Sequence, residues 1–386
     1  MEDPTTFHRE IYRRGLAGEE PSIPVASAEL ERAATAGLEE RVASYIAAGA
    51  GAEQTMEANL DAFRRRRIVP RMLRNVAERD LELELLGTTM AAPLMLAPIG
   101  AQSIVHPDGE KATARAAAAT AVPMIASTAS HFSLEEIAAA GGPEAKLWFQ
   151  LYWARDADLV TSLVRRAEAA GYAVIVVTVD TFVVGWKPRD LQHAWLPFMN
   201  GIGVANYFED PVFRAALKHP PEEDPGAATN HFLTVREDPT LTWDDVARLR
   251  EITSLPIVVK GIQHVDDARE ALARGLDGVV VSNHGGRQVD GAVGALDLLS
   301  PIAEAVGDDL VVLFDSGVRS GTDVLKALAL GADAVCLGRP YLWGLALEGQ
   351  AGVEAVLKMT LTELDMTMAL CGLSKRREIG RDLFAD

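Results

Sequence analysis

The segment SNHGGRQ, at positions 282–288, holds side chains that could remove a proton and bind an acid. The imidazole of His284 can accept a proton near neutral pH. Gly285 and Gly286 allow a sharp turn, which could bring Arg287 back over the site to clamp a carboxylate. A single histidine at the end of a strand is equally well explained as a core residue. A histidine followed by Gly-Gly-Arg is better explained as part of a catalytic site.

Polar residues of catalytic type also close several other short apolar runs. Amide, hydroxyl, carboxylate and ammonium groups of this kind can bind a cofactor and move protons. Any one of them could be a satisfied polar residue of the core. Their concentration at the ends of successive runs favours one shared site. These residues are Gln150, Tyr152, Thr178, Asp180, Lys260 and Asp315.

The apolar runs themselves predict eight strands. Continuous apolar runs of this length are typical of strands buried on both faces, as in a parallel sheet. The expected strands cover Met95–Gly100, Pro123–Thr128, Leu147–Trp153, Val174–Asp180, Pro256–Gly261, Gly278–His284, Leu310–Gly317 and Ala334–Pro340.

Amphipathic helical patterns alternate with these runs. Ser133 and Glu136 form the capping-box spacing of a helix start, and several of the patterns end at glycine. We expect helices over 109–121, 133–140, 156–170, 265–274, 295–306 and 321–330. An open doubly wound sheet is the alternative to a closed barrel. The count of eight βα units favours the (β/α)8 TIM barrel, which needs about 250 residues.

The chain of 386 residues is therefore predicted to be a single α/β domain, 1–386, with its barrel at about 91–345. Residues 1–90 read as a helical extension with a small hairpin, and 341–386 as a helical tail. A long insertion, about 181–241, follows the fourth strand. An insertion at this position lies over the catalytic face, so it could be a mobile lid. It is equally well explained as a contact between subunits or as an insertion without a function of its own.

Two glycine–arginine segments predict a phosphate site. Asp315–Arg319 (DSGVR) closes the seventh expected strand, and Gly338–Arg339 closes the eighth. Glycine lets backbone N–H groups approach an anion, and arginine adds a two-point contact. The loops after strands seven and eight are the usual phosphate site of this barrel. A phosphorylated ligand or cofactor is therefore expected.

Composition excludes several classes of function. The net charge of −18 argues against nucleic acid as a partner, because binding phosphates needs a basic surplus. The spacing of Cys336 and Cys371 resembles no metal site and no disulfide framework, so we expect no metal. No apolar run has the length of a membrane span. A polar N-terminus and reduced thiols predict a cytoplasmic protein without a membrane partner.

Taken together, these motifs resemble the FMN-dependent L-2-hydroxy acid oxidases and dehydrogenases. The resemblance extends from about Tyr45 to about Gly344, and SNHGGRQ is its most specific part. The branch that resembles the chain most is lactate 2-monooxygenase. The grounds are the segments RMLRNVAERDL (71–81), FQLYW (149–153), GWKPRDL (185–191) and KGIQH (260–264), together with APIG ending at Gly100.

The resemblance implies a role for each catalytic residue. His284 would remove the proton from the substrate hydroxyl or alpha carbon, and Asp180 would stabilise the charged imidazole. Arg287 and Tyr45 would hold the substrate carboxylate, and Tyr152 would hydrogen-bond the substrate hydroxyl.

The resemblance also implies FMN as the cofactor. Lys260 would stabilise negative charge on the reduced flavin, as burying an anion requires a fixed cation. Gln150, Thr178 and Ser127 would hydrogen-bond the ring system, and Asp315 the ribityl hydroxyls. The remaining cofactor-binding residues are Pro98, Ile99 and Gly100 beside the flavin ring, Ser282, and Gly317, Arg319, Gly338 and Arg339 at the phosphate.

Two positions qualify the resemblance. The family usually has a second arginine where this chain has Lys187, which keeps the charge but loses the planar fork, so the substrate is left open. Plain oxidases tend to carry alanine at the position of Gly100. Glycine there would leave space beside the flavin, as expected for the decarboxylating branch.

The function implied is oxidation of a small, lactate-like L-2-hydroxy acid to the 2-keto acid with molecular oxygen. Oxidative decarboxylation, as in lactate 2-monooxygenase, could accompany it. The alternatives are a dehydrogenase with a non-oxygen acceptor, a flavin enzyme of this fold with a different substrate, and a barrel without catalysis. The resemblance also suggests a homotetramer or homo-octamer.

Overall fold

Eight parallel strands form the closed barrel at the centre of the molecule. The computed structural model describes residues 5–385; residues 1–4 and 386, which the domain prediction also included, lie outside them. The barrel order is β10-β3-β4-β5-β6-β7-β8-β9, so the prediction of a (β/α)8 barrel is confirmed and an open sheet was the wrong alternative. Its strands are β3 (Leu94–Leu96), β4 (Met124–Ser127), β5 (Leu147–Tyr152), β6 (Ile175–Thr178), β7 (Ile257–Ile262), β8 (Gly278–Val281), β9 (Val311–Phe314) and β10 (Ala334–Leu337).

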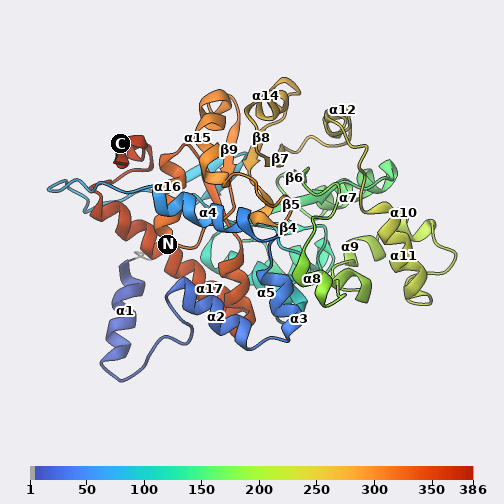
Figure 1. Ribbon diagram of the computed structural model, residues 1–386, viewed down its shortest axis with the longest axis horizontal. Coiled ribbons are helices and arrows are strands. Elements are labelled where there is room, and N and C mark those ends of the chain that lie inside the picture. The colour runs from blue at the N-terminus through green and yellow to red at the C-terminus, as the bar shows by residue number, and fades with distance from the viewer. Residues whose placement is uncertain (1–4, 386) are drawn as a thin grey trace.

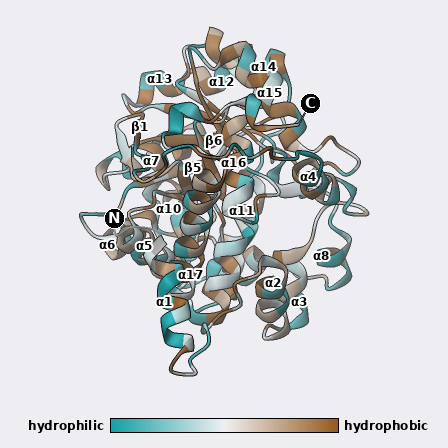
Figure 2. Ribbon diagram, turned by 90° about the vertical axis from the view of Figure 1, so that its left-hand side faces the viewer, coloured by the Kyte–Doolittle hydropathy of each residue, from teal (hydrophilic) through white to brown (hydrophobic). Residues whose placement is uncertain are grey.

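Helices surround the barrel and cover its outer face. Figure 2 shows mostly hydrophobic strands at the centre, surrounded by helices that carry both hydrophilic and hydrophobic residues. The six expected helices are all present, and the capping box of Ser133 and Glu136 begins α6 as predicted. They are α5 (Gly109–Thr120), α6 (Leu134–Gly141), α7 (Ala157–Ala169), α14 (Val265–Ala273), α15 (Ala295–Val306) and α16 (Gly321–Ala329), with the 3-10 turns η1 (Gln102–Ile104) and η3 (His284–Gly286).

The N-terminal extension is helical, as expected, and its hairpin closes the bottom of the barrel. Leu83, Leu85 and Met90 pack against Trp148 and other inward-facing strand residues, and the Trp148 indole donates to the Thr88 hydroxyl over 2.9 Å. α1 projects from the body beside the C-terminal helix (Figure 1). The elements are α1 (Thr5–Gly15), α2 (Ser27–Ala36), α3 (Glu40–Ala47), α4 (Gln54–Arg65), β1 (Leu83–Leu85) and β2 (Thr88–Met90).

The C-terminal tail is also helical. α17 (Arg339–Leu370) follows β10 directly and breaks at Glu348 and Gly349, where its two parts fold against each other. Gly344 and Gly352 allow this close approach, because a Cβ on either would clash with the other's backbone. Two short 3-10 turns follow, η4 (Arg376–Glu378) and η5 (Arg381–Leu383). No helix among residues 5–385 is long and apolar enough to cross a membrane.

The insertion after β6 contains more helix than its sequence indicates. Only its end, 242–253, has a clear helical pattern, yet short helices occupy most of the segment. Proline begins several of them, and Asp210 and Asp224 cap two through their carboxylates, so local capping replaces periodicity as the determinant. They are α8 (Pro188–Gln192), η2 (Pro197–Asn200), α9 (Ala205–Phe208), α10 (Pro211–Ala215), α11 (Pro225–Val235), α12 (Trp243–Ala247) and α13 (Leu249–Ile252).

Candidate active site

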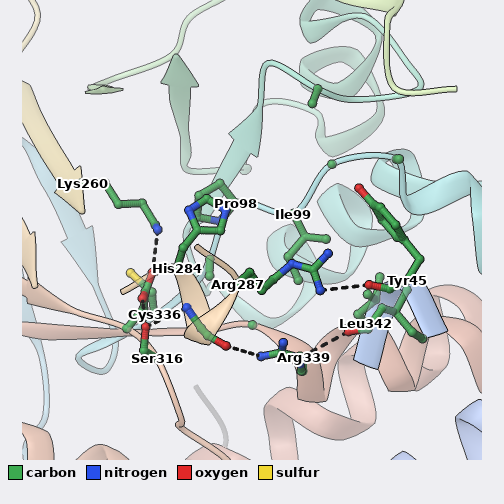
Figure 3. Close-up of a pocket in the computed structure, with 18 of the residues that line it drawn as sticks. Tyr45, Pro98, Ile99, Lys260, His284, Arg287, Ser316, Cys336, Arg339 and Leu342 are labelled. Atoms are coloured by element: carbon green, nitrogen blue, oxygen red, sulfur yellow. Dashed lines mark hydrogen bonds and ion pairs between the residues drawn. The ribbon is translucent and has the colours of Figure 1, made fainter. Parts of the chain in front are cut away.

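A cavity of about 170 Å³ opens at the C-terminal ends of the barrel strands. Figure 3 shows Lys260 and His284 together on one side of it, with Arg287, Tyr45 and Arg339 on the other. Most of the residues predicted from the sequence line it. They are Tyr45, Pro98, Ile99, Gly100, Tyr152, Lys260, His284, Arg287, Asp315, Gly317, Arg319, Gly338 and Arg339.

His284 and Asp180 form a hydrogen-bonded pair. The imidazole Nδ1 lies 2.9 Å from the Asp180 Oδ1. The His284 side chain is 22% exposed and that of Asp180 only 6%, so the imidazole can reach a substrate while its partner stays buried. Burial raises the pKa of Asp180, but the positive charges of His284 and Lys260 outweigh it and leave that pKa below its ordinary value. The carboxylate is therefore ionised and able to stabilise an imidazolium.

Lys260 is buried between Asp315 and Ser282. Its Nζ lies 3.1 Å from the Asp315 Oδ2 and donates to the Ser282 Oγ over 3.0 Å. Burial opposes its positive charge, yet Asp315 and Asp180 raise the pKa of Lys260 above its ordinary value. A fixed cation thus lines the floor of the cavity. The sequence indicated both Lys260 and Asp315 but not their ion pair.

Two buried polar atoms on strands of the barrel lack hydrogen-bond partners among the described residues, although neither residue lines the cavity itself. They are the Gln150 Nε2 and the Thr178 Oγ1, at the ends of β5 and β6. Gln150 accepts a hydrogen bond from Ser127 over 2.9 Å, which directs its amide nitrogen elsewhere. Leaving such groups unpaired costs about 1–3 kcal/mol each. A bound heterocycle with acceptor and donor edges, as in a flavin, would satisfy them.

The far end of the cavity can hold a phosphate. Arg319 and Arg339 line it together with Gly317 and Gly338. Burial, together with the positive charges of the neighbouring Arg319 and Arg287, lowers the pKa of Arg339 to about 9, because these effects outweigh the opposing charges of Glu31 and Glu53. Gly317 has φ +87°, and a Cβ there would lie 3.0 Å from Asn59, so only glycine fits this loop. The residues present therefore fit FMN along the whole cavity.

The last carbonyls of α3 hold two of the site arginines. Arg287 donates from Nη1 to the carbonyls of Tyr45 (2.9 Å) and Ala48 (2.5 Å). Arg339 donates to the carbonyls of Ile46 (3.3 Å) and Ala48 (3.1 Å). The final carbonyls of a helix have no partner within the helix, so cations are favourable there. The N-terminal extension thus fixes both arginines at the cavity.

Tyr152 and Lys187 were both predicted to contact the substrate, and Tyr152 lines the main cavity as well as an adjoining one. Burial raises the pKa of Tyr152 to about 12, so its hydroxyl stays protonated and can donate a hydrogen bond. Lys187 does not line the main cavity. It lies in an adjoining cavity that also reaches Tyr45, Tyr152 and Arg287, with its Nζ 3.6 Å from the Asp190 carboxylate.

Gly100 lines the main cavity, but its Cβ position points away from free space. A Cβ there would clash with the Ala129 carbonyl oxygen and lie 2.9 Å from the Ala129 Cβ. Glycine therefore permits a close approach of the loops after β3 and β4. The space expected beside the flavin is not created simply by the absence of a methyl group at this position.

Several site residues escaped the sequence analysis. Ser316 is one of them, and its backbone is in the left-handed region, with φ +88°. Its hydroxyl donates a hydrogen bond to Asp315 and accepts hydrogen bonds from the backbone N–H groups of Asn283 and Gly285. These bonds join the end of β9 to the loop that carries His284. The sequence offered one indication of a role for Ser316, namely its position inside the DSGVR motif. The adjoining cavity is lined by insertion residues with no such signal. They include Thr181, Val184, Leu196, Phe198, Tyr207, Phe232, Arg236 and Glu237.

Among residues 5–385, no group of three or more His, Cys, Asp or Glu side chains could hold a metal ion. Cys336 and Cys371 are both buried and free, as expected. Cys336 lines the cavity, and burial raises the pKa of its thiol well above the ordinary value, so it is a poor nucleophile.

Comparison with known proteins gives concordant results. A family model described as FMN-dependent dehydrogenase matches residues 34–386. An FMN-dependent alpha-hydroxy acid dehydrogenase of Penicillium citrinum is 44% identical, over 98% of this chain and 94% of its own length. An L-lactate oxidase of Lysinibacillus sphaericus is 43% identical, over 95% and 94%.

Solved structures agree with these relatives. A crystal structure of mandelate oxidase superimposes with a TM-score of 0.82 at 42% identity, covering 93% of this chain and 97% of that one. A family model that matches most of the chain and relatives above 40% identity over nearly their full length leave one conclusion, in agreement with the resemblance seen in the sequence. The chain belongs to the family of FMN-dependent dehydrogenases, which are oxidoreductases with FMN as their cofactor.

Proposed function

We propose that this protein oxidises an L-2-hydroxy acid to the corresponding 2-keto acid, with molecular oxygen as the final acceptor. The observation that carries the proposal is the meeting of His284, Arg287 and Lys260 at one cavity, with Asp180 behind the histidine. Relatives named L-lactate oxidase and 4-hydroxymandelate oxidase support the same substrate class. When bound, FMN accepts the two electrons that the substrate loses.

The residues divide the work of the reaction. Arg287 neutralises the substrate carboxylate, with Tyr45 beside it and Lys187 as a second cation. Tyr152 donates a hydrogen bond to the substrate oxygen. His284 takes a proton from the substrate, and Asp180 stabilises the resulting imidazolium. The hydroxy acid loses two protons and two electrons in total, and becomes the keto acid.

The cofactor-facing residues act by binding and electrostatics. Lys260 balances the negative charge that arrives with the two electrons. Ser127, Gln150 and Thr178 would hold the ring system of a bound FMN, and Asp315 and Ser282 fix the ammonium group of Lys260. Arg319 and Arg339 bind the phosphate at the other end.

Anaerobic titration with L-lactate, glycolate and L-mandelate tests the proposal. The yellow protein should lose its absorbance near 450 nm with at least one of these acids, and admitting oxygen should restore it. If none of these 2-hydroxy acids bleaches the flavin, the proposed activity is refuted. Bleaching without recovery in air would indicate a dehydrogenase with another acceptor.

A decarboxylating reaction is the second candidate. The resemblance of several sequence segments to lactate 2-monooxygenase supports it, and Gly100, in one of these segments, lines the cavity where a keto acid product would remain. Product analysis after aerobic turnover with L-lactate separates the two outcomes. Pyruvate with peroxide identifies an oxidase, and acetate with carbon dioxide identifies a monooxygenase.

We further propose a cytoplasmic homo-oligomer of four or eight copies. Two free, buried cysteines support a reducing compartment. Exposed apolar side chains at Phe182, Val183 and Trp186 form a surface that a second copy could cover. Light scattering of the purified holoenzyme tests the number of copies in the oligomer. Fractionation of the source cells tests the cytoplasmic location.

A further inference from the structure

The adjoining cavity, of about 120 Å³, extends the site away from the flavin cavity. The two cavities share Tyr45, Ala129, Tyr152, Phe198, His284 and Arg287, which are the residues around the reacting centre. The remaining lining residues belong to the insertion, apart from Gln288. The adjoining cavity is therefore the place for the substituent on C2 of the substrate, and the insertion decides what fits there.

Charges in this cavity are balanced except at one residue. Lys187 pairs with Asp190 at 3.6 Å, and Arg236 pairs with Glu237. Among the described residues, no carboxylate lies within ion-pair distance of Arg287, which donates hydrogen bonds to backbone carbonyls and lies over the ring of Tyr45. Asp190 interacts with the charges of both Arg287 and Lys187, so the cations of this cavity exceed its carboxylates by one. This surplus can accommodate one carboxylate, which is the C1 carboxylate of the substrate. A second negative charge on the substrate would have no counter-ion and would lie near Glu237.

The wall of the cavity is aromatic, with a guanidinium set into it. The Arg236 guanidinium stacks 5.4 Å from the ring centre of Phe198 and 5.7 Å from that of Phe232. Tyr207 packs edge-on against Phe232 at 4.9 Å. A ring or another large apolar substituent would gain contacts with these surfaces that a methyl group cannot reach.

Part of the Arg236 donor set is free. Its Nε and Nη2 both bond the Glu237 carboxylate, and its Nη1 has no hydrogen-bond partner among the residues that the structure describes. The Arg236 side chain is nevertheless 13% exposed and lines the cavity. A partly desolvated N–H on a residue that lines a cavity favours an acceptor in the ligand.

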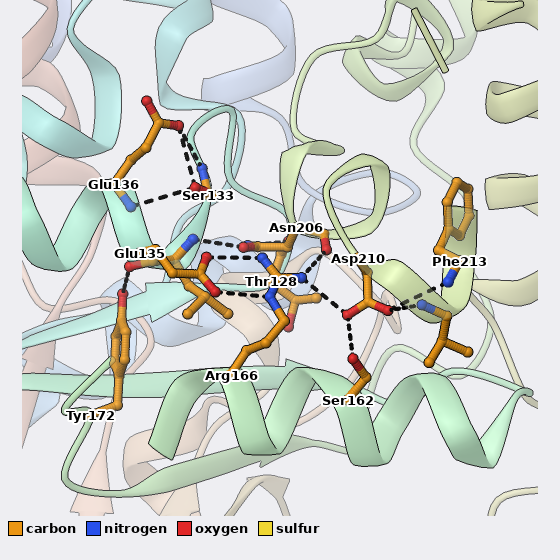
Figure 4. Close-up of polar contacts among 12 residues, drawn as sticks. Thr128, Ser133, Glu135, Glu136, Ser162, Arg166, Tyr172, Asn206, Asp210 and Phe213 are labelled. Carbon is orange, nitrogen blue, oxygen red and sulfur yellow. Dashed lines mark hydrogen bonds and ion pairs between the residues drawn. The ribbon is translucent and has the colours of Figure 1, made fainter. Parts of the chain in front are cut away.

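Tethers hold this wall in place. Arg155 bonds the carbonyls of Val235 (2.9 Å) and Glu237 (2.7 Å), on either side of Arg236. Earlier in the insertion, the Asn206 side chain bonds the carbonyls after β4, and Arg166 bonds the Asp210 carboxylate, as Figure 4 shows. Arg236 thus projects from a backbone that is fixed to the barrel, as positioning a ligand requires.

We propose that Arg236 is a specificity-determining residue, and that the preferred substrate is an aromatic 2-hydroxy acid with an uncharged hydrogen-bond acceptor on its ring. The ring lies against Phe198, Phe232 and Tyr207, and the acceptor takes a hydrogen bond from the Arg236 Nη1. This inference rests on the proposed oxidation of 2-hydroxy acids and names the substrate class for it.

The test is an anaerobic flavin-reduction titration of the holoenzyme with L-lactate, L-mandelate, 4-hydroxy-L-mandelate and 4-carboxy-L-mandelate. The variants are Arg236→Met, Arg236→Lys, and Arg236→Met with Glu237→Gln, which removes the unpaired acid. Arg214→Met is the matched control, because Arg214 is another insertion arginine that pairs with an acid, Glu222, and lines neither cavity.

We expect 4-hydroxymandelate to bind the unmodified protein about 10-fold more tightly than mandelate, the effect of one hydrogen bond. Arg236→Met and the double variant should lose this advantage, while their Kd for lactate changes less than about 2-fold. Arg236→Lys should keep part of it, and Arg214→Met all of it. The ratio of the Kd values for mandelate and 4-hydroxymandelate is measured within each variant. A general loss of stability would affect both Kd values alike and would leave this ratio unchanged.

Three results would overturn the inference. They are equal affinity for the two mandelates in the unmodified protein, an advantage that survives in both methionine variants, and tighter binding of the 4-carboxy acid than of the 4-hydroxy acid. In each of these cases the flavin is still reduced and the proposed activity stands. Failure of every 2-hydroxy acid to reduce the flavin would instead refute the activity itself.

Discussion

The Nδ1 of His284 lies 2.9 Å from the Oδ1 of Asp180, and this contact joins the ends of β8 and β6 across β7. His284 adopts a left-handed backbone conformation, with φ +57°, and its N–H donates to the Ser282 hydroxyl. The ring is therefore held from both the backbone and the side chain. Residues kept in such sparsely populated conformations often serve a site, because surrounding contacts must hold them there.

Replacement of His284 by glutamine should abolish proton removal without emptying the cavity. Glutamine keeps a polar side chain of similar reach, while the cofactor contacts of Lys260, Arg319 and Arg339 are untouched. We expect the variant to retain FMN and to reduce it roughly 10²- to 10⁴-fold more slowly with substrate. Anaerobic stopped-flow absorbance measures the rate. An unchanged rate would remove His284 from the mechanism.

The variant Asp180→Asn should show how much the negative charge of Asp180, beside the His284 imidazole, contributes to the rate of flavin reduction. Asparagine fits the same space but cannot stabilise an imidazolium, so we expect flavin reduction to slow by about 10²- to 10⁴-fold. The Kd of substrate should change far less, because Asp180 lines neither cavity. Rate and Kd come from one anaerobic concentration series. A variant that loses affinity but keeps its limiting rate would show that Asp180 only shapes the site.

Lys187 should make substrate binding depend on pH. Burial, assisted by the charge of Arg287, lowers the pKa of Lys187 to about 8. The protonated form attracts a carboxylate, so affinity should be full below about pH 8 and fall as pH rises through that value. Anaerobic Kd values between pH 6.5 and 9.5 measure the effect. An arginine keeps its charge to a higher pH than a lysine in the same place, so Lys187→Arg should flatten the alkaline limb. A limb that persists in this variant would assign it to another group.

Arg339→Met should weaken FMN binding and spare the protein fold. The guanidinium stands beside Arg319 and Arg287, and its pKa of about 9 reflects burial and this repulsion. The phosphate of FMN would relieve the repulsion, so we expect the variant to bind FMN about 10- to 100-fold more weakly. The apoprotein should unfold at the same or a slightly higher temperature. Fluorescence titration of apoprotein with FMN and with riboflavin checks this, because riboflavin, which lacks the phosphate, should not distinguish the variant.

Local patterns were sufficient to predict the barrel and to name most of the proposed site residues, which the fold brings to one cavity. Continuous apolar runs indicated buried parallel strands, and the polar residues that end them were expected to meet, because parallel strands end at one rim. Lys260 and His284 illustrate this, since they close neighbouring strands and lie at the same cavity. The short insertion helices and the tight contact at Gly100 were not visible, because capping and loop-to-loop packing leave no periodic signal.

The sequence by itself determined the fold, the family and the residue types that the chemistry needs, because strand burial and local motifs are written in neighbouring residues. Only the tertiary structure decided which partners those residues have. Asp315 pairs with Lys260, α3 carbonyls hold Arg287 and Arg339, and Arg236 reaches the cavity from a distant insertion. These contacts join residues far apart in the chain, and their geometry depends on how loops and helices pack around the closed barrel rather than on any spacing along it.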